Sequence, residues 1–217
     1  MDFLQLFLQL AQGAGYTLLV TCACIATGLC SGLLVALLGR LDHAWLNFLL
    51  AAYVRIFRSI PVLVLLFIIF FGLPGFGIRV PPLLAMMLSL GLITGAYLAE
   101  VFRGALAAID ENELLAAEAM GLGRTQTLLA IEMPQMLRFA LPGMLNEFTT
   151  VLKYSPFAYT VGIPEIMKEA MALAATTLRG TEIYLAIGLL YFAIYKAMLA
   201  ALRTIARRYS IPGFNEF

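Results

Sequence analysis

Long apolar stretches separated by short polar segments dominate the pattern of this chain. A helix crosses the hydrocarbon core of a membrane with about 20 apolar residues, because every backbone N–H and C=O there has to be paired within the helix. The first charge-free stretch ends at Arg40 and predicts a span over Tyr16–Leu38. The stretches between Arg58 and Arg79 and between Arg79 and Glu100 predict a second and a third span.

Two later stretches are more polar but still long enough to cross a membrane. Ala140–Val161 contains Glu147 and Lys153 and is interrupted by Pro156, and Ile183–Leu202 contains one lysine near its end. The pattern therefore predicts an all-α integral membrane protein of about five transmembrane helices, with its two termini on opposite sides.

The distribution of lysine and arginine predicts the orientation in the membrane, because loops on the cytoplasmic side carry an excess of them. If the N-terminus lies outside, the inside segments hold nine of these residues: Arg40, Arg55, Arg58, Arg103, Arg124, Arg138, Arg203, Arg207 and Arg208. The outside segments then hold Arg79, Lys168 and Arg179. This imbalance predicts an N-terminus outside and a C-terminus in the cytoplasm. Residues 1–15 place leucine and phenylalanine on one helical face and glutamine on the other, which predicts an interfacial helix.

The composition agrees with a lipid environment, since 62% of the 217 residues are hydrophobic and only 12% are charged, against about 25% charged in soluble domains. The formal net charge of +1 and the absence of a basic run argue against a nucleic-acid partner. The three cysteines share one apolar stretch without histidine, so we interpret them as packing residues rather than metal ligands or disulfides. No repeat or linker divides residues 1–217, which predicts a single transmembrane domain.

The segment 104–137, between the third and fourth spans, differs from the rest of the chain. Asp110 followed by Glu113 is a helix-start signal, and an alanine-rich helix continues from it to Gly121. Thr125–Ile131 restarts a helix, which we expect Pro134 to close. This arrangement predicts two short helices around a glycine turn on the cytoplasmic face, either docking on another protein or lying on the chain's own spans.

This segment resembles the EAA loop of permease subunits in bacterial ABC importers. Two alanines, then a glycine, an isoleucine and a proline, stand at the spacing of that motif: Ala116, Ala117, Gly121, Ile131 and Pro134. The leading glutamate of the motif is replaced by Leu115, with Glu113 and Glu118 on either side. Segments elsewhere resemble the polar amino-acid permeases of the histidine, arginine and opine type: FRSIP (57–61), GAYLAEVFRGAL (95–106), PQMLRFALPGMLNEF (134–148), VLKYSPF (151–157) and RRYS (207–210).

The resemblance implies one half of a type I (MetI-like) importer in the bacterial inner membrane. Two permease chains, alike or different, would form the pore, a cytoplasmic ATPase dimer would hold ATP and magnesium, and an external binding protein would deliver an amino acid. This chain has no GxxxxGK[ST] motif of its own, and no enzymatic role is expected. The resemblance assigns the coupling to the ATPase to Ala116, Ala117, Glu118, Gly121, Leu122, Gly123, Ile131 and Pro134.

Polar residues within a span are candidates for function, because burying them in lipid is unfavourable. The fourth span contains a group of them, which we take as candidates for the substrate path: Asn146, Glu147, Thr150, Lys153, Tyr154 and Ser155. Glu147 suits the ammonium of an amino acid and Lys153 its carboxylate. Relatives often have Asn or Gln where Glu147 stands, which favours a basic solute. The alternative is that these groups pair with neighbouring helices and only hold the bundle together.

Two other classes of membrane protein are weighed against an importer. An ion-driven carrier or channel often shows two related halves with matching broken helices, which this sequence does not show. A membrane enzyme would need converging histidine, cysteine, serine or carboxylate groups, and this chain has one histidine and scattered acids. The glycine-broken alanine helix is what separates the importer from both.

Overall fold

The computed structural model describes residues 3–41 and 43–208, and nearly all of these are helical, with no strand among them. The ends of the predicted interfacial helix and of the predicted domain at residues 1–2 and 209–217 lie outside this range. The α-helices are α1 (Phe3–Ala11), α2 (Ala14–Leu38), α3 (Ala44–Ser59), α4 (Val62–Phe67), α5 (Pro82–Met86), α6 (Leu92–Ala107), α7 (Glu111–Ala119), α8 (Arg124–Thr127), α9 (Met133–Tyr154), α10 (Ile166–Thr177) and α11 (Gly180–Arg207). Turns of π-helix at Ile68–Gly72, Met87–Gly91 and Leu128–Glu132, and 3-10 helices at Leu73–Phe76 and Ser155–Val161, connect several of them.

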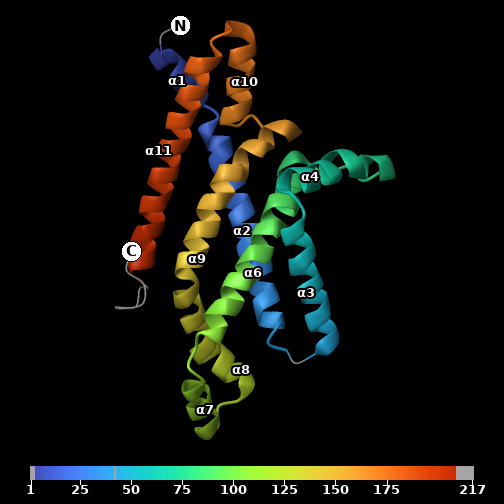
Figure 1. Cartoon of the computed structure of the whole chain (residues 1–217), viewed down its shortest axis with the longest axis vertical. Coiled ribbons are helices and arrows are strands. Elements are labelled where there is room, and N and C mark those ends of the chain that lie inside the picture. Colours follow the sequence, from blue (N-terminus) through green and yellow to red (C-terminus); the bar gives the residue numbers. More distant parts are fainter. Residues whose placement is uncertain (1–2, 42, 209–217) are drawn as a thin grey trace.

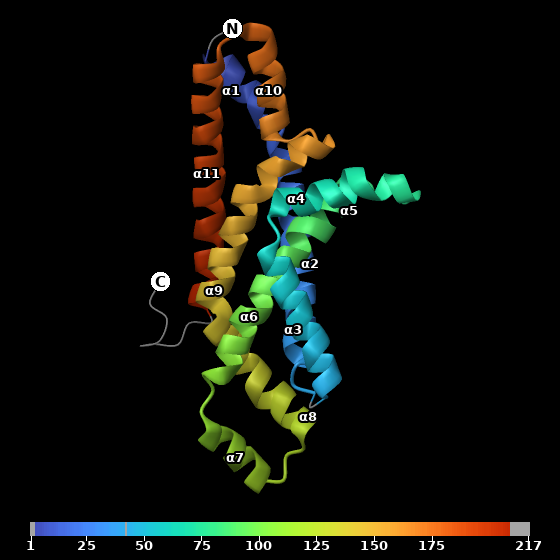
Figure 2. The same cartoon turned by 45° about the vertical axis from the view of Figure 1, so that its right-hand side comes forward.

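The long helices α2, α3, α6, α9 and α11 run along one axis as a bundle (Figures 1 and 2). The helices α1 and α10 lie beside the start of α11 at one end, and α7 and α8 form a hairpin at the other end. Large apolar side chains are exposed on the outer faces of the bundle, including Leu18, Leu19, Leu34, Leu185, Leu189 and Phe192. Such faces suit contact with lipid rather than water.

Three helical stretches are long and apolar enough to cross a membrane: Gln5–Leu38, Pro82–Ala107 and Gly180–Arg207. They correspond to the predicted first, third and fifth spans. The fourth, α9, is 22 residues long and lies in the same bundle, but it is not among the stretches that are apolar enough by composition.

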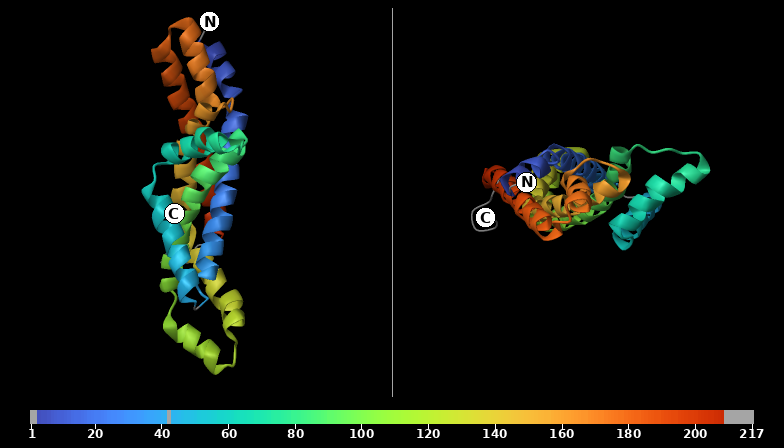
Figure 3. Two further views of the ribbon diagram at one scale, coloured as in Figure 1. Left: turned by 90° about the vertical axis from the view of Figure 1, so that its right-hand side faces the viewer. Right: turned by 90° about the horizontal axis from the view of Figure 1, so that it is seen from above.

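The second predicted span, between Arg58 and Arg79, is corrected by the structure. The upright helix is α3, which lies before that stretch, and the chain after it turns by 102°. The helix α4 and its continuation to Phe76 extend away from the bundle (Figure 3). Pro61 explains the turn, because Ile60 before it takes an extended conformation (φ −96°, ψ 129°) that an α-helix cannot continue.

Arg55 and Arg58 therefore lie within the bundle, on α3, rather than in an inner loop. Without these two, seven of the nine inside residues remain against three outside.

Helices α2 and α6 pack closely because glycines face each other. A Cβ placed on Gly32 would lie 2.8 Å from the Cβ of Leu98 and 2.9 Å from the carbonyl oxygen of Gly95. A Cβ on Gly28 would lie 2.7 Å from a methyl carbon of Thr94. Glycines that bring two backbones together in this way are common between helices in lipid, where dispersion contacts replace the hydrophobic effect.

Helix α1 packs through its apolar face, with Leu6 and Leu10 buried against α10 and α11. Its location at a membrane surface stays a prediction. Glu165, at the start of α10, is fully buried and accepts a hydrogen bond of 2.6 Å from the hydroxyl of Tyr191 on α11. It also accepts one of 3.0 Å from the N–H of Lys168, so a single carboxylate joins α10 to α11.

Candidate functional site

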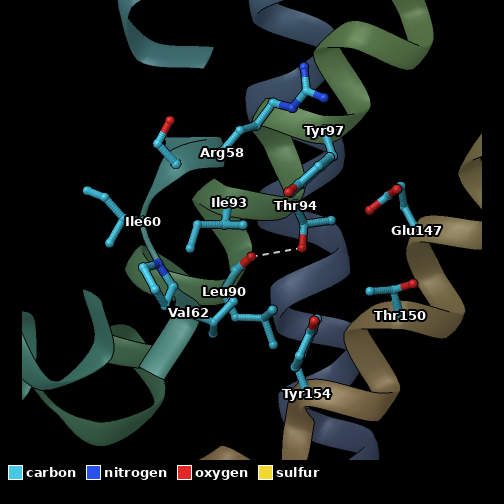
Figure 4. Close-up of a pocket in the computed structure, with 12 residues that line it drawn as sticks. Arg58, Ile60, Val62, Leu90, Ile93, Thr94, Tyr97, Glu147, Thr150 and Tyr154 are labelled. Carbon is cyan, nitrogen blue, oxygen red and sulfur yellow. Dashed lines mark hydrogen bonds between the residues drawn. The ribbon is translucent and has the colours of Figure 1, made fainter. Parts of the chain in front are cut away.

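A cavity of about 360 Å³ lies at the end of α3, between α3, α6 and α9 (Figure 4). We call it the Glu147 cavity. Its lining residues are Arg58, Ser59, Ile60, Pro61, Val62, Leu90, Ile93, Thr94, Tyr97, Glu147, Thr150 and Tyr154. It is large enough for a solute of amino-acid size, since ligand pockets begin at about 300 Å³.

Arg58 brings a cation to the wall of this cavity. It is the last residue but one of α3, just before the break at Pro61. Its guanidinium carbon lies 5.0 Å from the ring centre of Tyr97, and its Nη1 lies 3.7 Å from a carboxylate oxygen of Glu100. Its side chain remains 42% exposed, so it can still bind a further anion.

Glu147 supplies an anion from the opposite wall. Glu147, Thr150 and Tyr154 recur at spacings of three and four residues, so they share one face of α9, and they point toward α6 and the end of α3 (Figure 4). Glu147 is half-buried. A cation and an anion on facing walls match the two charges of a zwitterionic amino acid.

The structure does not bring the other predicted path residues to this cavity. Lys153 follows Glu147 by six residues, about 120° around the helix, and its Nζ lies 5.5 Å from the ring centre of Tyr195 on α11. Asn146 is exposed, and the hydroxyl of Thr150 donates to its backbone oxygen.

Ser155 is fully buried, and its hydroxyl donates a hydrogen bond of 2.9 Å to the backbone oxygen of Leu152. The cation on the wall of this cavity is Arg58, which the sequence placed in an inside segment, and not Lys153. Pro61 was the signal that could have identified Arg58. A helix has to end before a proline, so Arg58 was predictable as a residue of the last turn of a helix.

The predicted hairpin at 104–137 is present as α7, a turn and α8. Asp110 caps α7 by accepting a hydrogen bond of 2.9 Å from the N–H of Asn112, and Gly121 makes the turn with a φ of +80°. Of the candidate coupling residues, Ala117 is fully buried against the chain itself. Ala116, Glu118, Gly121, Gly123 and Pro134 are exposed, and Leu122 and Ile131 are partly buried.

Two large apolar residues join the exposed part of α7. Leu115, which occupies the place of the motif's glutamate, is 60% exposed, and Met120 is 72% exposed. Glu113 is engaged within the chain, because its carboxylate accepts a hydrogen bond from the side chain of Gln135.

The expectation that Pro134 closes the second loop helix is wrong. The helical run continues from Arg124 through the π-turn Leu128–Glu132 into α9, with Pro134 in the first turn of α9. A proline inside a helix lacks its N–H and crowds the carbonyl four residues earlier. The wider π-turn lies just before it, where a helix can absorb such a local disturbance.

The loop is also tied to the end of α2. An Nη of Arg40 lies 2.5 Å from Oε1 of the buried Glu132, and the guanidinium of Arg124 donates to the backbone oxygen of Arg40. At the end of α6 nearest the hairpin, Arg103 donates two hydrogen bonds to Glu100, at 3.1 and 2.5 Å. Within the described residues no group of His, Cys, Asp and Glu could hold a metal ion.

Comparisons with known proteins identify the family of the chain. The family model described as "Binding-protein-dependent transport system inner membrane component" matches residues 7–211. A probable glutamine ABC transporter permease protein, GlnP of Bacillus subtilis (strain 168), is 33% identical over 217 aligned residues, which cover 96% of this chain and 100% of the relative. The histidine/lysine/arginine/ornithine transport system permease protein HisQ of Escherichia coli (strain K12) is 31% identical, with 92% of each chain covered.

Solved structures show the same fold. A crystal structure of an amino acid ABC transporter with histidines matches with a TM-score of 0.86 at 27% identity, covering 96% of this chain and 99% of that one. An inward-facing structure of the MetNI methionine ABC transporter matches with a TM-score of 0.75, covering 93% and 96%; at 22% identity it supports the fold alone.

Proposed function

The chain belongs to the family of binding-protein-dependent transport system inner membrane components, and from this premise we propose how it moves its solute. The expected MetI-like fold and the role as the membrane-spanning subunit of an amino-acid ABC importer are confirmed. The protein is a multi-pass protein of the bacterial inner membrane. Membership implies a cytoplasmic ATPase and an external solute-binding protein as partners.

We propose that residues 1–217 act as one transmembrane domain, and that a second permease chain, alike or different, completes the pore. The α7–α8 end would face the cytoplasm, as the arginine distribution indicates. ATP and magnesium would then bind to the ATPase, which docks at that end.

The solute-binding proposal rests on one observation, the facing charges of Arg58 and Glu147 in the same cavity. The carboxylate of the amino acid would pair with the Arg58 guanidinium and its ammonium with Glu147. The aromatic and aliphatic lining, with Tyr97 and Tyr154 on two walls, would hold the rest of the molecule.

The coupling proposal follows from the continuity of the helix that begins at α8. Because the run from Arg124 to Tyr154 is continuous, a displacement of the hairpin is carried directly to Glu147. The Arg40–Glu132 pair passes the same displacement to α2. An ATPase that grips the exposed face of α7, with Leu115 and Met120, could therefore reshape the cavity when its dimer closes.

Uptake of labelled amino acids by cells that carry the complete transporter tests the solute site. Glu147→Gln should lower uptake about tenfold or more at unchanged surface expression, because a charge-assisted hydrogen bond is worth ~1.5–3 kcal/mol. Glu182→Gln is the matched control, since Glu182 lies at the start of α11 and lines neither this cavity nor the hairpin. Normal uptake by Glu147→Gln would disprove the assignment of Glu147.

Co-purification tests the coupling site. Tagged chain extracted gently from its membrane should bring down the ATPase, and mass spectrometry will also show whether a second permease chain is present. The double variant Leu115→Gln/Met120→Gln should lose ATPase, whereas Ile78→Gln should not, because Ile78 is also apolar and 54% exposed but follows the segment that extends away from the bundle. Full ATPase recovery with the double variant would place the docking surface elsewhere, and uptake that continues without ATP would replace the importer with a carrier.

A further inference from the structure

A second cavity lies next to the Glu147 cavity, along α3 and α6, the two helices that line both. It has a volume of about 670 Å³ and is lined by residues of α2, α3 and α6. Four arginines line it, Arg40, Arg55, Arg58 and Arg103, against a single acid, Glu100. We call it the arginine cavity.

The two cavities adjoin at Arg58 and lie along the same face of α6, and we call the two together the track. On α6 the Glu147 cavity is lined by Ile93 and Tyr97, and the arginine cavity continues at Glu100 and Arg103. These spacings of three and four residues keep to one face of the helix. Arg58 lines both cavities. The residues that follow it, from Ser59 to Val62, line the Glu147 cavity, and residues that precede it on α3 line the arginine cavity.

The charges along this track do not cancel. Arg40 is paired with Glu132 and Arg103 with Glu100, while Arg58 lies between Glu100 and the Glu147 cavity. Arg55 is exposed on the cavity wall, and within the described residues its guanidinium has no hydrogen bond or ion pair, although its backbone oxygen accepts a hydrogen bond of 2.7 Å from the hydroxyl of Ser59. Arg55 is therefore the excess cation of the track.

An uncompensated guanidinium in a walled cavity attracts an oxyanion and repels a cation. Either the carboxylate of a passing solute or the phosphate of a lipid headgroup could supply that oxyanion. Because the arginine cavity adjoins the Glu147 cavity at Arg58, the solute is the favoured source.

From this charge pattern we infer that the arginine cavity is the second half of the solute path, and that Arg55 makes the transporter prefer acidic and neutral amino acids to basic ones. This inference rests on the proposed import of amino acids. It reverses the sequence-based expectation of a basic solute, because Glu147 faces Arg58 and leaves no net negative charge in its cavity.

The test compares uptake of glutamate, glutamine and lysine by cells that carry the transporter with its ATPase and binding protein. The unmodified protein should take up lysine least. Arg55→Glu should lower the glutamate-to-glutamine ratio about tenfold, equivalent to ~1.4 kcal/mol, and raise the lysine-to-glutamine ratio. Arg55→Gln should shift both ratios by less, and Arg55→Lys should preserve them. Because every variant is assayed with the same binding protein, the selectivity of that protein cancels when the ratios of two variants are compared.

Arg79→Gln is the matched control, since Arg79 is exposed and lines neither cavity. Lysine uptake above that of glutamine in the unmodified transporter would overturn the inference, and so would ratios that do not change in Arg55→Glu. If Arg55→Glu lowered the uptake of all three solutes equally, and the size of that decrease varied with the anionic lipid content of proteoliposomes, Arg55 would be assigned to a lipid headgroup instead. If no amino acid is taken up at all, the proposed function itself fails.

Discussion

The close approach of α2 and α6 makes Gly32→Ala the sharpest test of the packing in this bundle. The added methyl group would meet Leu98 at 2.8 Å, the carbonyl oxygen of Gly95 at 2.9 Å and the N–H nitrogen of Ala99 at 3.2 Å. Two of these three atoms belong to the backbone, so no side-chain rotation can relieve the overlap.

Overpacking of this kind costs about 1–3 kcal/mol. Replacing a glycine by alanine within a helix also stabilises the folded state, by about 0.5–1 kcal/mol, and this partly offsets the cost. Gly104→Ala measures that gain alone, because Gly104 lies on the neighbouring helix α6 and a Cβ there would meet nothing within 4 Å. The difference between the two variants isolates the steric cost, which we expect to be about 1–3 kcal/mol.

The assay is reversible unfolding in mixed micelles, followed by circular dichroism as the fraction of SDS is raised. Gly32→Ala should unfold at a lower SDS fraction than the unmodified protein, and Gly104→Ala at the same or a higher one. If Gly32→Ala proved as stable as Gly104→Ala, the two backbones would not be in the contact described, and the reasoning would be refuted.

Three further predictions concern the two ends of the bundle. Gly121→Ala should loosen the α7–α8 turn by about 1–2 kcal/mol, because φ there is +80°; faster hydrogen exchange in α7 would show it, and unchanged exchange would contradict it. Asp110→Ala should remove the cap of α7, worth ~1 kcal/mol, and speed limited proteolysis at its first turn, which an equal cleavage rate would rule out. Burial raises the pKa of the Glu165 carboxyl above its usual 4.5, so the folded protein holds that proton more tightly than the unfolded chain and loses stability as the pH rises above 4.5. Glu165→Gln should remove this pH dependence of the unfolding temperature and Glu169→Gln should keep it; the same pH dependence in both variants would be evidence against the argument.

The apolar pattern by itself determined that this is a helical membrane protein and placed three spans, because an uninterrupted apolar run has no other stable solvent than lipid. It also located the hairpin, since a cap at Asp110 and a glycine at 121 act through the local backbone. The family followed from spacings that the sequence displays directly, and the comparisons confirmed it.

The tertiary structure decided what depends on the relative placement of distant segments. The apolar run after Arg58 looked like a span, but the break at Pro61 turned it away from the bundle and made α3 the upright helix. That break brought Arg58 opposite Glu147, a pairing of residues 89 positions apart that no local pattern contains. Lys153 suited the carboxylate of an amino acid by chemistry, yet its place on α9 directs it to Tyr195. The positions of the charged residues are known from the sequence. Which of them neutralise one another depends on residues that become neighbours only when the helices pack.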